Sequence, residues 1–98
     1  MYAADINQAL ALYGPRFVQI YGQGESPMTI TVLPRDLVAD VTHPNAERRR
    51  ASVGFAHANV SVRIVDEAMV DLPTGEVGEI AVAGETVMKG YWRNEEAT

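Results

Sequence analysis

The spacing of apolar positions changes along the chain, and it predicts a helix followed by a strand. Residues 5–13 carry apolar side chains at helical spacing, namely Ile6, Ala9, Leu10 and Tyr13. Asp5 is a suitable N-cap, and Gly14 with Pro15 is a typical helix end. The next run, 17–21, is apolar at nearly every position, which predicts a strand covered on both faces. Helix, stop and buried strand together indicate an α/β unit.

The middle of the chain alternates between breaks and short elements. Two glycines and Pro27 predict a loop over residues 22–27, and residues 29–33 have the composition of a strand. Residues 34–38 are typical of a helix start, with proline in the first position. The polar stretch 40–52 is predicted to be an exposed connection between two parts of the chain.

From Val53 onward the pattern favours β structure. Alternating or short apolar runs predict strands over residues 60–64, 79–83 and 86–88. Residues 73–76 predict a turn with Gly75 where a positive φ is needed. Asn94 is a typical N-cap and is followed by two acidic residues, but the helix that this pattern predicts is too short to form.

The predicted fold class is therefore α+β. Residues 1–40 would be the end of an α/β, Rossmann-like subdomain that carries a nucleotide-loop motif, and residues 41–52 an exposed connection. Residues 53–98 would be most of a small antiparallel β subdomain, truncated at its C-terminal end. Because the last element is incomplete, we expect the chain to be an internal fragment of a larger protein.

Composition excludes several classes of protein. The 98 residues contain no cysteine, which excludes disulfide frameworks, Cys-based zinc sites and thiol nucleophiles and fits a cytoplasmic location. The net charge is −5 and the only basic run is Arg48 to Arg50, so nucleic-acid binding is not expected. No apolar run is long enough for a transmembrane segment, and no secretory signal is expected.

The segment from Tyr21 to Glu25 is the most informative candidate site. It follows the predicted buried strand, where α/β proteins place ligand loops. An aromatic ring can stack on a nucleobase, glycines let backbone N–H groups approach phosphate, and a carboxylate can hold Mg²⁺. These parts are compatible with a nucleotide–metal site, but their composition alone is equally typical of an ordinary turn.

Two segments taken together resemble a known family. The first, Tyr21-Gly22-Gln23-Gly24-Glu25, is similar to the aromatic-Gly-X-Thr-Glu motif of the adenylate-forming, or AMP-binding, enzymes. The second runs from Gly75 to Asn94 and resembles that family's long Gly-Glu-(Leu/Ile)-X-Val-X-Gly-X-X-Val-Met-X-Gly-Tyr-Trp motif. The family includes acyl-CoA synthetases, peptide-synthetase adenylation domains and luciferases, and the likeness covers nearly the whole chain.

The resemblance implies an activity and roles for four residues. Such enzymes activate a carboxylic acid with ATP and Mg²⁺ as an acyl-adenylate, and most then transfer the acyl group to a thiol, usually CoA. Tyr21 would stack on adenine, Gly22 would let the backbone pass close to the nucleotide, and Glu25 would hold Mg²⁺. Gly24 would lie near the phosphate, where the family usually has threonine, so either a backbone N–H or Ser26 would replace the missing hydroxyl.

Three other parts of the family's site are not among these residues, namely its upstream phosphate loop, its downstream Thr-Gly-Asp motif and its C-terminal lysine. We therefore assign no catalytic residue to this fragment and expect it to be inactive alone and to self-associate. The resemblance implies that the larger parent protein is an acyl-CoA synthetase, in particular a long-chain fatty acid–CoA ligase. The alternatives are an acyl-AMP ligase or carrier-protein-loading adenylation domain, and a non-catalytic small interaction module.

Overall fold

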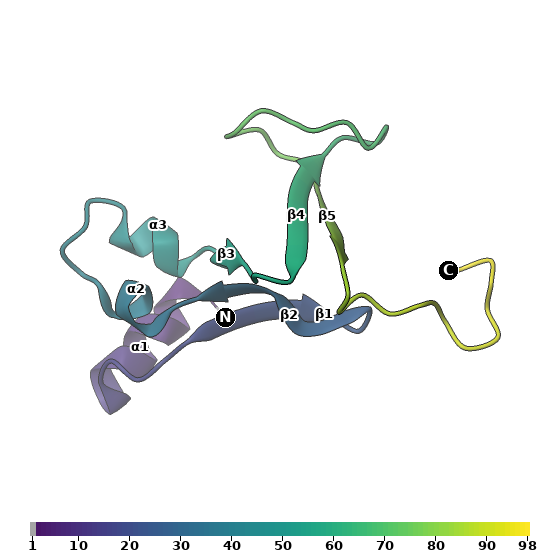
Figure 1. Ribbon diagram of the computed structural model, residues 1–98. Coiled ribbons are helices and arrows are strands. Elements are labelled where there is room, and N and C mark those ends of the chain that lie inside the picture. The colour runs from purple at the N-terminus through teal and green to yellow at the C-terminus, as the bar shows by residue number, and fades with distance from the viewer. Residues whose placement is uncertain (1) are drawn as a thin grey trace.

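The computed structural model describes residues 2–98, which form three short helices and two antiparallel sheets (Figure 1). The first sheet has the order β1-β2-β3, and the second is the hairpin β4-β5. The helices are α1 (Ala3–Tyr13), α2 (Arg35–Ala39) and α3 (Ala46–Arg50), and the strands are β1 (Gln19–Gln23), β2 (Ser26–Leu33), β3 (Phe55–Ala56), β4 (Val60–Val65) and β5 (Glu79–Gly84). This arrangement confirms the predicted α+β class.

The predicted first helix is present, but its cap is not the predicted one. Helix α1 begins at Ala3 with Tyr2 at the N-cap, and no side chain caps it. Asp5 lies inside the first turn, where its negative charge suits the positive end of the helix dipole. The helix ends at Gly14, which has φ +74° and donates its N–H to the Leu10 carbonyl at 2.9 Å. The predicted stop is thus confirmed, and the predicted Asp5 cap was wrong.

A small apolar core joins α1 to the end of β2. Its buried members are Ile6 from α1, Leu33 from β2 and Val38 from α2. Partly buried side chains surround them, namely Leu10, Phe17 and Leu37. Figure 1 shows the three helices gathered at one end of the first sheet, so the other end of the β1–β2 hairpin is free to carry a site.

Strand β1 is an edge strand, and the prediction that it is covered on both faces was wrong for residues 2–98. Only β2 pairs with it, and the strand spans 19–23 rather than 17–21. Val18 is 54% exposed and Ile20 48%, because none of the described elements covers that face. An apolar hollow of about 230 Å³ lies beside it, lined in part by Ile6, Phe17 and Val18.

The segment 40–52 is more ordered than predicted. Helix α3 forms within it, and Ala46 and Arg50 are buried. The Asp40 carboxylate accepts hydrogen bonds from the N–H and hydroxyl of Thr42, both at 2.8 Å, and forms a 3.4 Å ion pair with Arg49. Most of residues 41–52 are exposed, and the segment is nevertheless held in place because Asp40 ties α2 to α3.

The second sheet agrees with the sequence pattern. Strands β4 and β5 pair in register from Val60↔Gly84 to Val65↔Glu79. The predicted turn is confirmed, with Gly75 at φ +101° and the Glu76 N–H bonded to the Pro73 carbonyl at 3.1 Å. The predicted strand over 86–88 was wrong, since these residues have no strand partner and form a turn and bend against β1–β2.

The described chain is more open than a compact domain. Its radius of gyration is 15.8 Å, against about 13 Å expected for a compact domain of 100 residues. Figure 1 shows why, since the β4–β5 hairpin projects away from the first sheet and the last residues extend beyond it. None of the helices among residues 2–98 has the length and apolar character to cross a membrane.

The hydrogen bonds at Asp40 predict a pH-dependent stability. The Thr42 N–H, followed by the Thr42 hydroxyl, the His43 N–H and the Arg49 charge, hold the pKa of Asp40 below its usual value of 3.8. A carboxyl whose pKa is lowered by folding stabilises the protein above the unfolded-state pKa, and that contribution is lost as the pH falls through the folded-state value. Asp40→Asn should therefore lower the urea midpoint at pH 7, and the difference from the wild type should shrink below about pH 4. Asp71→Asn is the control, because its ion pair with Arg63 is exposed and contributes little.

Candidate functional site

The predicted nucleotide loop is a tight hairpin. Gln23 pairs with Ser26, so only Gly24 and Glu25 form the turn between β1 and β2. The prediction of a loop over 22–27 was wrong, because both strands continue into it. The next pair is Tyr21↔Thr31, which leaves extra residues in β2 and produces a bulge. Met28 lies in this bulge at φ +56°.

Gly22 is the residue that permits this bulge. A Cβ atom at Gly22 would lie 2.5 Å from the Ser26 carbonyl oxygen and closer still to the Met28 amide nitrogen. Both obstacles are backbone atoms, so a side chain could be accommodated only by moving β2. Gly24 differs, because a Cβ atom there would meet nothing within 4 Å. A side chain is thus excluded at Gly22 by the β2 backbone, whereas there is room for one at Gly24.

Tyr21 and Glu25 are brought to one small cavity. It has a volume of about 160 Å³ and lies between the β1–β2 hairpin and β5. Its lining consists of Tyr21, Gln23, Glu25, Ser26, Ile30, Ile80, Val82 and Val87. Tyr21 accepts a hydrogen bond at its hydroxyl from the Gln23 amide at 3.0 Å. Pockets for whole small ligands are usually about 300 Å³ or larger, so this cavity could form only part of a nucleotide site.

The Glu25 carboxylate is held by a residue from beyond the second sheet. The Tyr91 hydroxyl donates a hydrogen bond to Glu25 Oε1. This bond, followed by one from the Glu25 backbone N–H, holds the pKa of Glu25 below its usual value, and the same contact raises the pKa of Tyr91. Glu25 is therefore ionised at neutral pH. No local pattern in the sequence predicts this contact, because the two residues are 66 positions apart.

Ser26 is occupied by structural hydrogen bonds. Its hydroxyl lies 3.1 Å from the hydroxyls of both Thr29 and Thr86, and the residue is only 2% exposed. The sequence offered Ser26 or a backbone N–H as a replacement for the threonine hydroxyl absent at Gly24. Because Ser26 is buried and already bonded, and the Glu25 N–H is bonded to its own carboxylate, the backbone N–H of Gly24 is the better candidate.

A divalent cation fits Glu25 as one ligand among several. Magnesium is commonly bound through one or two carboxylates together with substrate phosphates and water. No group of three His, Cys, Asp or Glu side chains that could hold a metal ion occurs within the described residues. An ionised, partly exposed Glu25 suits a cation that arrives with a phosphate ligand, and it does not suit a protein-only metal site.

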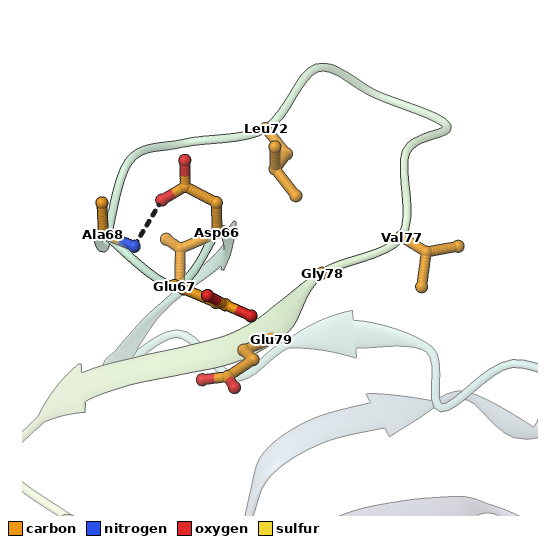
Figure 2. A pocket seen from close by; sticks show the side chains of 8 residues that line it. Asp66, Glu67, Ala68, Leu72, Val77, Gly78 and Glu79 are labelled. Atoms are coloured by element: carbon orange, nitrogen blue, oxygen red, sulfur yellow. Dashed lines mark hydrogen bonds between the residues drawn. The ribbon is translucent and has the colours of Figure 1, made fainter.

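A larger hollow lies at the tip of the other sheet and is not connected to this site. It has a volume of about 580 Å³ and is lined by Val65, Asp66, Glu67, Ala68, Leu72, Val77, Gly78 and Glu79. Figure 2 shows the Asp66 carboxylate turned toward the amide of Ala68, with which it makes a 2.9 Å hydrogen bond. Its acidic groups are exposed or used in turns, so its size does not indicate a reaction site.

Comparison with known proteins identifies the family of the chain. The family model for AMP-binding enzymes matches residues 1–92. A medium/long-chain-fatty-acid–CoA ligase of Mycobacterium tuberculosis is 36% identical over 93% of the chain, and a D-alanine–D-alanyl carrier protein ligase of Streptococcus pneumoniae is 35% identical over 85%. The structure of the amide bond synthetase McbA from Marinactinospora thermotolerans superimposes on 97% of the chain with a TM-score of 0.83 and 30% identity.

The proteins that the chain matches are adenylate-forming enzymes. The chain belongs to the AMP-binding enzyme family, as its two motifs implied. It spans 15% of each of the two ligases and 18% of the amide bond synthetase. The described structure therefore corresponds to a small part of such an enzyme.

The contrast between the two glycines gives a paired prediction. Gly22→Ala should destabilise the protein by about 1–3 kcal/mol, because the new methyl group forces the β2 backbone to move. Gly24→Ala should change the free energy of unfolding by less than about 0.5 kcal/mol, since its surroundings are open. Urea unfolding of the two variants tests this, and equal losses would contradict the observed register of β2.

Proposed function

We propose that this chain is part of an ATP-dependent acyl-CoA synthetase. The enzyme would join a carboxylic acid, in particular a fatty acid, to AMP with release of pyrophosphate. It would then transfer the acyl group to the thiol of CoA with release of AMP. The observation that carries the proposal is the β1–β2 turn, where the Tyr21 ring and the ionised Glu25 carboxylate adjoin one cavity and Gly22 between them lets the two backbones pass close together. The 36% identity to a fatty-acid–CoA ligase supports the choice of substrate.

The proposed roles follow the chemistry of each side chain. Tyr21 would stack on the adenine, and Gly22 would keep the backbone close to the nucleotide. Gly24 would offer its backbone N–H to phosphate, because glycine adds no side chain there. Glu25 would hold Mg²⁺, which when bound neutralises charge on the phosphates.

A second candidate changes only the thiol acceptor. The parent could be an acyl-AMP ligase or an adenylation domain that loads a carrier protein, and the 35% identity to a D-alanine–D-alanyl carrier protein ligase favours this class. The two candidates are distinguished by an acceptor assay, in which the full-length enzyme is supplied first with CoA and then with a carrier protein. Acyl transfer to CoA supports the first proposal, and transfer only to the carrier protein supports the second.

The third candidate is a non-catalytic interaction module. A free-standing module should be compact, but the described chain has a large radius of gyration and exposed apolar side chains at Val18 and Ile20. These features favour the enzyme. A cytoplasmic location is part of the same proposal, and the absence of cysteine from the 98 residues is compatible with it.

The role of Glu25 is tested by Glu25→Gln in the full-length enzyme. The amide keeps the size of the side chain but removes the negative charge that attracts the cation. Acyl-adenylate formation, measured by exchange of pyrophosphate into ATP at several Mg²⁺ concentrations, should fall roughly a hundredfold. Glu76→Gln, an exposed position in the turn region between β4 and β5, is the matched control. Wild-type exchange by the Glu25 variant would eliminate the proposed metal role.

The 98-residue chain alone should be inactive and should self-associate. Residues that act as a unit lose nearly all turnover when most of them are absent, and this chain covers less than one fifth of the proteins it matches. The edge of β1 that is unpaired among the described residues, with the exposed side chains of Val18 and Ile20, offers a surface for strand pairing. Pyrophosphate exchange should not exceed background, and sedimentation at millimolar concentration should show oligomers. A monomer at that concentration would contradict the second expectation.

A further inference from the structure

Two segments distant in the sequence meet at Glu25. The Tyr91 hydroxyl donates to the carboxylate of Glu25, and the Met88 N–H donates to its backbone carbonyl at 2.7 Å. Both donors lie in the segment that follows β5. Figure 1 shows this segment passing the end of the β1–β2 hairpin before it continues to the C-terminus. The backbone and the side chain of Glu25 are thus held separately.

The backbone of the turn does not depend on Tyr91. The Met88 bond fixes the carbonyl of Glu25, and the 3.1 Å contact between the Ser26 and Thr86 hydroxyls fixes the adjacent residue. Both contacts would remain if the Tyr91 hydroxyl were removed. What the hydroxyl adds is therefore the orientation of the Glu25 carboxylate.

Tyr91 is itself fixed from behind by a local turn. Its N–H donates to the Thr98 hydroxyl at 3.0 Å, and that hydroxyl donates to the Asn94 carbonyl at 2.8 Å. Gly90 allows the chain to pass close to Thr98, since a Cβ atom at Gly90 would lie 2.9 Å from the Thr98 hydroxyl oxygen. The backbone that carries the phenol is therefore held within a hydrogen-bonded local turn.

A held carboxylate is a better cation ligand than a free one. Glutamate loses rotational freedom when its carboxylate is fixed, and a contact that fixes it beforehand reduces that cost at the moment of binding. A carboxylate has about four acceptor positions, so one bond from Tyr91 leaves others for a cation.

We propose that Tyr91 is a positioning residue whose hydroxyl orients the Glu25 carboxylate toward the divalent cation. This proposal rests on the metal role of Glu25 in the proposed function. It assigns Tyr91 neither contact with the substrates nor a proton-transfer step. The segment after β5 thereby becomes a support for the metal ligand.

The test is Tyr91→Phe in the full-length enzyme, which keeps the ring and removes the hydroxyl. Mn²⁺ serves as the probe, and its binding in the presence of ATP and the absence of acid substrate is followed by electron paramagnetic resonance. The Mn²⁺ concentration for half-saturation should rise about fivefold. The rate of pyrophosphate exchange at saturating metal and the thermal midpoint should stay at wild-type values. Tyr13→Phe, which removes a hydroxyl from the end of α1, is the matched control.

A double variant separates positioning from a general structural effect. If Tyr91 acts through Glu25, Tyr91→Phe should add nothing to the loss of Mn²⁺ affinity caused by Glu25→Gln. Additive losses, an equal effect in the Tyr13 control, or a lowered thermal midpoint with unchanged Mn²⁺ affinity would each overturn the proposal. If Glu25→Gln weakens Mn²⁺ binding and Tyr91→Phe does not, only the Tyr91 proposal fails. If Glu25→Gln leaves Mn²⁺ binding unchanged, the metal role fails and the Tyr91 proposal fails with it.

Discussion

The close passage of β2 over Gly22 is the constraint on which the site depends. Because no side chain separates the two backbones at this point, β2 can bulge, and the turn shortens to Gly24 and Glu25. That short turn places Glu25 beside the segment after β5, and it places Tyr21 on the same cavity. A longer turn would separate the ring from the carboxylate. The geometry of the site thus follows from one missing Cβ atom and the register it allows.

Local signals in the sequence predict much of the fold. The helical spacing before Gly14, the turn at Gly75 and the alternation in β4 and β5 are determined by neighbouring residues, and all appear as expected. The errors arise where partners are distant or absent. Strand β1 has the composition of a covered strand, but the described residues supply no element to cover it. The segment 86–88 has a strand-like composition, but its hydrogen bonds go to the β1–β2 turn instead of a sheet.

The candidate site shows the same division. The types of residue in the turn indicate nucleotide chemistry, and the family resemblance suggests their roles. The support of Glu25 by Tyr91, and the burial of Ser26 against Thr86, depend on tertiary contacts that no spacing rule reports. The difference between Gly22 and Gly24 is likewise invisible in the sequence, where both are simply glycines in a turn, and it becomes clear only from the atoms around them.

The separation of Glu25 from Tyr91 also bears on how the site is assembled during synthesis. The turn leaves the ribosome 66 residues before the phenol that orients its carboxylate. Contacts between distant residues require closure of a long loop, and domains emerge in order from the N-terminus. The contacts that fix the backbone of the turn, from Met88 and Thr86, and the contact that fixes the Glu25 carboxylate, from Tyr91, all come from the segment after β5. An isolated two-stranded hairpin is at best marginally stable, so the native turn is completed only after the second sheet has been made. In a growing chain, the residues of this turn are therefore synthesised long before the contacts that hold them can form.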